Sequence, residues 1–154
     1  MNQEQRQRIV VGVQGSPASL AALRWAGREA GLRDTKVQVV RAWEHDARRV
    51  APYAVRSPLL AWEEDRLMAG AQVEEAVRAT LGPSSSVDVS VEVADGLAAR
   101  VLLDRAAGAE LLVLGSGGSS APGGIGPVAR ACLRSAPCPV VVVSAERVGA
   151  LVPA

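Results

Sequence analysis

Short runs of β-branched and aliphatic residues alternate along this chain with segments whose apolar residues recur at helical spacing. The short runs predict strands at residues 8–13, 36–42, 87–93, 111–114 and 140–143. The other segments predict helices at about residues 17–31, 59–81, 97–107 and 127–134. Strands that alternate with helices indicate an α/β domain, in which a parallel sheet carries helices on both faces.

The flanking residues place several of these boundaries. Ser16 is expected to cap the first helix and Pro17 suits its first position, whereas Gly31 is expected to end it. The first strand is apolar throughout, which is typical of a strand buried on both faces. In residues 87–93, valine alternates with Asp88, Ser90 and Glu92, which predicts a strand at the sheet edge with one wetter face.

Composition narrows the class of protein. The 154 residues are 49% hydrophobic and 21% charged, as expected for one globular domain with its core at about residues 8–144 and a tail at 145–154. The net charge of +1 favours neither nucleic acid nor an anionic membrane as a partner. Residues 1–8 lack the apolar stretch of a signal peptide, and no apolar run is long enough to span a bilayer. We therefore expect a cytoplasmic protein.

A glycine-rich loop follows the fourth predicted strand. The chain reads Leu111-Leu112-Val113-Leu114-Gly115-Ser116-Gly117-Gly118, and a helix is predicted to begin just after Gly126. Such a loop at a helix N-terminus presents free main-chain N–H groups and suits a phosphate. In a parallel sheet, ligands bind beyond the carboxyl ends of the strands, where the strand order reverses. The loop and the end of the first strand are therefore the candidate site.

Several segments in this order resemble the universal stress protein family. They are Ile9-Val10-Val11-Gly12-Val13-Gln14-Gly15-Ser16-Pro17, Ala42-Trp43-Glu44, Val93-Ala94-Asp95-Gly96, Leu111 to Gly118, and Ala136-Pro137-Cys138-Pro139 with the valines behind it. The resemblance covers residues 8–144. It implies a Rossmann-like α/β domain, a five-stranded parallel sheet in the order 3-2-1-4-5 with helices on both faces. It also implies a homodimer.

The family contains members that bind ATP and members that do not. The resemblance implies a binding motif of Gly, two residues, Gly, nine residues, Gly and then Ser or Thr, with an Asp at the end of strand 1. Here seven residues separate Gly118 from Gly126, and Pro127 stands where Ser or Thr is expected. Ala129 occupies a second hydroxyl position, and Gln14 replaces the Asp. Proline has neither a hydroxyl nor a main-chain N–H, so it keeps the helix start and weakens an anion site.

These changes predict a degenerate nucleotide cleft with weak or no ATP binding. The candidate cleft residues are Val13, Gln14, Ala42, Gly115, Ser116, Gly118, Gly126, Pro127 and Val128. ATP stays possible as a ligand, and a loop without any ligand is an equally open interpretation. Arg130, in the first helical turn, offers a charge that can compensate for lost phosphate contacts.

No catalytic or metal-binding constellation is evident. The single histidine, His45, has no partners at ligand or triad spacing, so neither catalytic nor metal-binding residues are assigned. The sequence favours a non-enzymatic regulatory or interaction role, with a possible protein partner. An ATP-binding stress protein with slow hydrolysis, and a cleft reused for another small molecule, are the alternatives.

The last predicted strand points to self-association. In the order 3-2-1-4-5, residues Val140, Val141, Val142 and Val143 form an uncharged edge strand with proline only before it. A bare apolar edge invites pairing with another chain, and a two-fold dimer closes both edges at once. We therefore predict a homodimer through this strand.

Overall fold

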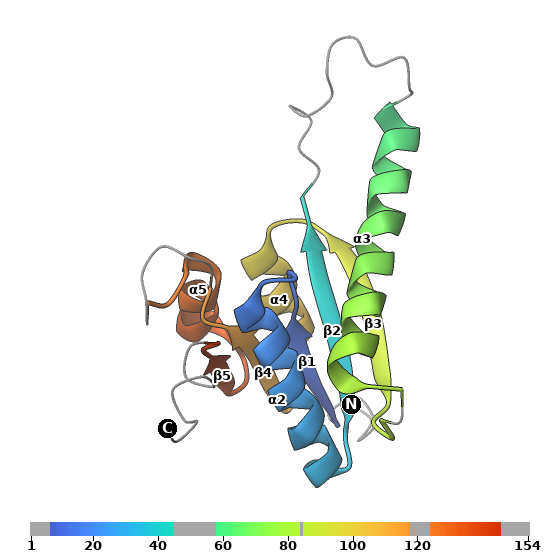
Figure 1. Ribbon diagram of the computed structural model, residues 1–154. Helices are drawn as coiled ribbons and strands as arrows, with labels where there is room; N and C mark the ends of the chain where they lie inside the picture. The colour runs from blue at the N-terminus through green and yellow to red at the C-terminus, as the bar shows by residue number, and fades with distance from the viewer. Residues whose placement is uncertain (1–6, 45–57, 84, 118–123, 146–154) are drawn as a thin grey trace, which may run out of the picture.

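A computed structural model describes residues 7–44, 58–83, 85–117 and 124–145 (Figure 1). The elements are β1 Arg8–Gly12, α2 Pro17–Arg33, β2 Lys36–Trp43, α3 Pro58–Leu81, β3 Val89–Asp95, α4 Ala98–Ala106, β4 Leu111–Gly115, α5 Pro127–Ser135 and β5 Val140–Val143. The strands form one sheet in the order β3-β2-β1-β4-β5, and every neighbouring pair is parallel. The predicted fold class and strand order are confirmed.

Two hydrophobic cores lie on opposite faces of the sheet. Helices α2 and α3 cover one face, where Ile9 and Val11 of β1 meet Leu23 of α2, and α4 and α5 cover the other (Figure 1). Val10, between Ile9 and Val11, points into the second core, which also contains Leu102 of α4. This alternation explains why β1 is apolar at every central position, as a strand with a helix on each face must be.

The sequence pattern misplaced the end of α2 and both ends of β3. Helix α2 passes through Gly31 and ends at Arg33. Its C-cap is Asp34, whose φ of 53° is left-handed and whose N–H donates to the Ala30 carbonyl. Asp tolerates this conformation because its short polar side chain can bond locally, so the glycine was not needed as the stop signal. Strand β3 begins at Val89, two residues later than the valine alternation suggests, and reaches Asp95. Its place at the sheet edge agrees with the prediction.

A side-chain network ties this edge strand to the helix behind it. Arg105 of α4 donates from Nε and Nη2 to the Glu92 carboxylate at 2.6–3.0 Å, and Gln38 of β2 donates to the same group at 3.0 Å. The hydrogen bonds from Arg105 hold the pKa of Glu92 below its ordinary value of 4.5, although partial burial opposes them. The fork geometry makes this the best-formed ion pair among the described residues.

We expect Glu92→Gln to lower the free energy of unfolding by about 1 kcal/mol at neutral pH, because the pair is partly exposed. The folded-state pKa lies below the unfolded one, so the ionised pair stabilises the protein above pH 4.5, and the stabilisation disappears as pH falls through the folded pKa. When urea unfolding is measured from neutral pH to about pH 3, the free energies of unfolding of the parent and of Glu92→Gln should converge. A gap that persists at about pH 3 would contradict this role. Glu75→Gln, in an exposed pair with Arg78, is the matched control and should cost less.

Candidate functional site

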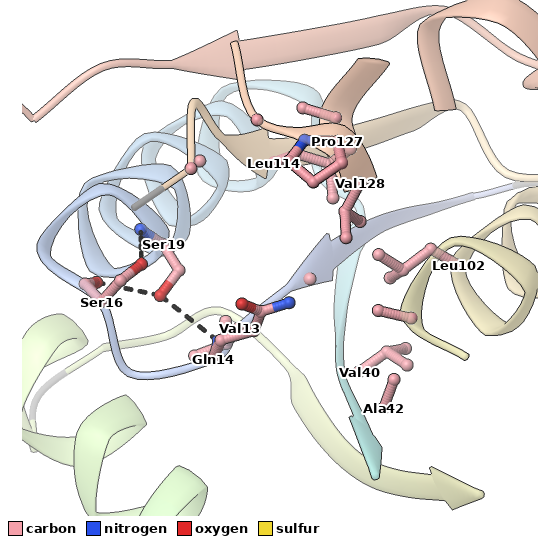
Figure 2. A pocket seen from close by; sticks show the side chains of 16 residues that line it. Val13, Gln14, Ser16, Ser19, Val40, Ala42, Leu102, Leu114, Pro127 and Val128 are labelled. Carbon is pink, nitrogen blue, oxygen red and sulfur yellow. Dashed lines mark hydrogen bonds between the residues drawn. The ribbon is translucent and has the colours of Figure 1, made fainter. Parts of the chain in front are cut away.

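A cleft opens where β1, β2 and β4 end and the helices of both faces begin (Figure 2). It encloses about 180 Å³. Its wall contains seven of the predicted site residues: Val13, Gln14, Ala42, Gly115, Gly126, Pro127 and Val128. Ser116 is not among the lining residues, although its carbonyl accepts from the Gly126 N–H, and Gly118, like His45 and the tail from residue 146, lies outside the described residues. The structure thus brings seven of the predicted residues together, and ligand binding by them stays a prediction.

Other lining residues escaped the sequence analysis. Val40 of β2, Leu102 of α4 and Leu114 of β4 add apolar side chains to the wall, and Ser16 and Ser19 add hydroxyls from the start of α2. A valine or leucine in an apolar strand or on the apolar face of a helix is expected to lie in the hydrophobic core, so nothing in the sequence pattern marks these three as cleft residues. Ser19, three residues after the predicted cap Ser16, carried a usable signal, because a side chain at that spacing faces back toward the helix start.

The start of α2 satisfies its own polar groups. The Ser16 hydroxyl accepts from the Ser19 N–H at 3.2 Å and caps the helix, as predicted. The Ser19 hydroxyl, only 4% exposed, donates to the Ser16 carbonyl at 2.9 Å and accepts from the Gln14 N–H at 3.3 Å (Figure 2). The Gln14 N–H is therefore already used, whereas the side-chain amide of Gln14 points into the cleft (Figure 2).

The loop after β4 is closed by a short main-chain bond. The Gly126 N–H donates to the Ser116 carbonyl at 2.7 Å, and the Ser116 N–H donates to the Val143 carbonyl of β5 at 2.9 Å. Gly117 has a φ of 108°, and a Cβ there would lie 3.0 Å from the Gly126 Cα. Glycine at position 117 is therefore required by both conformation and space. Because Gly126 donates within the loop, its N–H cannot serve a ligand without breaking that bond.

The start of α5 offers few anion donors. Pro127 occupies its first turn and has no N–H, and the N-cap Gly126 has no side chain to bond the helix. The N–H groups of Val128 and Ala129 remain as the donors with no acceptor inside the helix. Arg130 donates to the Ile125 carbonyl at 3.3 Å and does not line the cleft, so the structure gives it no part in binding there.

The electrostatics of the cleft come from the main chain. Among the residues that the structure describes, no lining side chain is charged, and the N-termini of α2, α4 and α5 all contribute to the wall through Ser16, Ala98 and Pro127. A helix N-terminus carries a partial positive charge, so three together favour a ligand with negative charge. An apolar cavity of about 150 Å³ takes benzene, so this cleft has room for one ring-sized group among apolar walls. A triphosphate would have to lie outside that space.

Two other features are absent from the residues that the structure describes. No group of three or more His, Cys, Asp or Glu side chains there is placed to hold a metal ion. Within the same part of the chain, no helix has the length and apolar character needed to cross a membrane.

Cys132 and Cys138 are free, and burial raises the pKa of both thiols.

Comparison with known proteins agrees with the resemblance seen in the sequence. Residues 5–144 match the sequence model of the Universal stress protein family. The chain belongs to this family. A universal stress protein of Mycolicibacterium smegmatis is 32% identical over 148 residues, which cover 90% of this chain and 48% of the relative. The chain therefore spans about half the length of the curated universal stress proteins that it matches.

Solved universal stress proteins share the fold at low sequence identity. One in complex with cAMP has a TM-score of 0.65 and 22% identity, over 91% of this chain and 98% of that chain. Another, from Archaeoglobus fulgidus in complex with dAMP, has a TM-score of 0.57 and 20% identity, over 89% and 97%. At this identity the likeness establishes the architecture alone, an α/β fold built on a parallel sheet.

Proposed function

We propose that this universal stress protein family member acts as a homodimeric regulatory or interaction module whose cleft binds ATP weakly or not at all. The observation that carries the proposal is the junction of Gly126 and Pro127. The Gly126 N–H already donates to the Ser116 carbonyl, and Pro127 has no N–H. A phosphate at this helix N-terminus would use both donors. The family fold is thus retained with an impaired anion site.

The expected weakening follows from these donors. A hydrogen bond to a charged group contributes on the order of 1.5–3 kcal/mol, so two lost bonds take a micromolar site to about the millimolar range or beyond. Gln14 adds to this, because a neutral amide cannot hold a metal ion as a carboxylate does. The cleft itself persists, with ring-sized room and apolar walls.

We expect calorimetry with ATP and magnesium to give a dissociation constant well above 100 µM, roughly in the millimolar range. A constant of about 10 µM or tighter would refute the proposal. The matched test is repair: Pro127→Ser combined with Gln14→Asp and two residues added to the loop should improve affinity at least about tenfold. Pro127→Ala alone restores the N–H without the hydroxyl and separates the two contributions. A repaired protein that binds no better than the parent would overturn the assignment of these residues.

The second candidate is a nucleotide-binding stress protein. The convergence of three helix N-termini on a cleft whose described lining is uncharged favours it, as do the relatives solved with cAMP and dAMP. Mass spectrometry of ligand released from the purified, denatured protein separates the candidates directly. A stoichiometric adenine nucleotide would favour this second function, and a different released molecule would indicate a reused cleft.

A further inference from the structure

A second hollow lies at the sheet edge opposite β5, between α3 and β3. It is larger and more open than the cleft, at about 540 Å³. Its apolar floor comes from Trp62, Leu67, Gly70 and Ala71 of α3 and from Val91 and Val93 of β3. Leu67 is 74% exposed, so part of this apolar lining faces solvent. We call this hollow the α3–β3 groove.

The main chain of β3 is open along this groove. The Val37 N–H of β2 donates to the Asp88 carbonyl just before β3, so the even-numbered residues of β3 point their main-chain groups toward β2. The groups of Val89, Val91 and Val93 therefore point outward, away from the sheet. Arg66 donates to the Val93 carbonyl at 3.1 Å, which confirms this direction. Among the described residues, the structure gives the outward groups of Val89 and Val91 no partner.

One end of the groove is held rigid by aromatic contacts. The Arg66 guanidinium lies 5.6 Å from the centre of the Trp62 ring, and that ring meets Trp43 of β2 edge to face at 5.7 Å. Arg66 thus bonds to the edge strand and packs on the groove wall at once. A wall fixed in this way loses little side-chain freedom when a ligand binds.

Gly70 keeps the middle of the groove open without being required by the fold. It lies inside a helix of 24 residues, where glycine costs about 0.5–1 kcal/mol relative to alanine. A Cβ at Gly70 would meet Val93 Cγ2 at 3.6 Å, an ordinary contact. Gly27 of α2 differs, because a Cβ there would lie 2.6 Å from Leu81. Packing explains Gly27, whereas at Gly70 the missing side chain serves only to leave space over β3.

We propose that the α3–β3 groove binds an extended peptide as an added strand beside β3, with apolar side chains toward α3 and a basic residue at each end. Glu63 and Glu74 lie on the rim and supply complementary charge, since Arg66 is engaged with Trp62 and Val93. They are eleven positions apart on α3, or roughly 16 Å along its axis. Alternate residues of a strand share a face, and six steps of about 3.3 Å place two lysines about 20 Å apart. The excess of roughly 4 Å over the spacing of the two glutamates is within the reach of the long, flexible lysine side chains. Main-chain bonds to β3 give affinity, and the groove gives selectivity.

This site is separate from the cleft and from β5, so it goes beyond the proposed function. Strand β3 is one end of the sheet and β5 is the other. A dimer formed through β5 leaves β3 open, and a ligand in the cleft does not touch the groove.

The test uses the peptide acetyl-Lys-Thr-Val-Thr-Val-Thr-Lys-amide, whose lysines and valines share one face, and calorimetry on the full chain. We expect saturable binding below about 1 mM and increased protection of the Val89 and Val91 amides from hydrogen exchange. Gly70→Leu fills the groove and Val91→Pro removes one outward N–H. Each should weaken binding at least about tenfold. Glu74→Lys should weaken the binding of this peptide and strengthen the binding of a second peptide in which glutamates replace the lysines.

Three matched variants control for a loss of binding that is caused by misfolding. Gly31→Leu adds the same side chain at an open position of α2, Glu75→Lys reverses a neighbouring charge outside the groove, and Val142→Pro alters the opposite edge. All three should bind as the parent does. No saturation by about 1 mM, equal affinity for the acidic peptide, or affinity unchanged in Gly70→Leu and Val91→Pro would overturn the proposal. So would dissociation of a parent dimer by Gly70→Leu, since the groove would then be an interface between two copies.

Discussion

Gly115→Ala is expected to destabilise the protein by at least about 3 kcal/mol and to lower its melting temperature by about 10 °C. Gly115 ends β4 directly beneath the first turn of α2. A Cβ there would lie 2.6 Å from the Ala18 carbonyl carbon and the Ser19 nitrogen. Both are main-chain atoms, which cannot turn aside as a side chain does. The helix would have to lift from the sheet, and Ser16 and Ser19 would leave the cleft wall with it.

Two other glycines serve as controls in thermal melts followed by circular dichroism. Gly31→Ala, in an open position of α2, should raise the free energy of unfolding by about 0.5–1 kcal/mol, because alanine is the better helix former. Gly12→Ala should have an intermediate cost, because its Cβ would meet the flexible ends of Leu114 and Leu102 at 2.9–3.0 Å. If Gly115→Ala melts as high as the parent, the close approach of α2 to β4 is wrong.

The fold was predictable because its signals are local. Five short apolar runs alternate with helical segments, and each run becomes a strand. The alternating valines of residues 87–93 marked β3 as an edge because half-buried strands expose every second side chain. Helix ends were harder. Gly31 and Asp34 are both able to end a helix, and the choice between them depends on the packing of α2, which the sequence does not display.

The sequence predicted where the cleft lies but only some of the residues that line it. Parallel strands end together, so Val13, Gln14 and Gly115 had to meet at one edge of the sheet. Leu102 reaches the same cleft from α4, and Gly115 is required by a contact with a residue almost a hundred positions away. Contacts of this kind leave no periodic signal. The α3–β3 groove was invisible for the same reason, because Arg66 finds Val93 only in the folded chain.

The second large effect concerns the proposed dimer. Strand β5 pairs with β4 on one side, and its four valines are all partly exposed in the single chain. The N–H of Leu112 in β4 donates to the Pro139 carbonyl, and the N–H of Ser116, just after β4, donates to the Val143 carbonyl. The main-chain groups of the odd-numbered residues of β5 therefore face β4. The main-chain groups of Val140 and Val142 therefore point outward, where a second copy of β5 would pair with them. An antiparallel pair of this kind satisfies both edges.

We expect Val142→Arg to convert the dimer to a monomer at tens of micromolar in light scattering behind a sizing column, because pairing would bury an unmatched charge. The Val142 side chain also packs toward the α4 and α5 core, so the arginine can perturb the chain itself. Val142→Pro is the cleaner variant: it removes an outward N–H and leaves the bonds to β4 in place. Val91→Pro makes the same change on the other edge and should leave the dimer intact. A parent that runs as a monomer, or a Val142→Pro protein that remains dimeric, would exclude this interface.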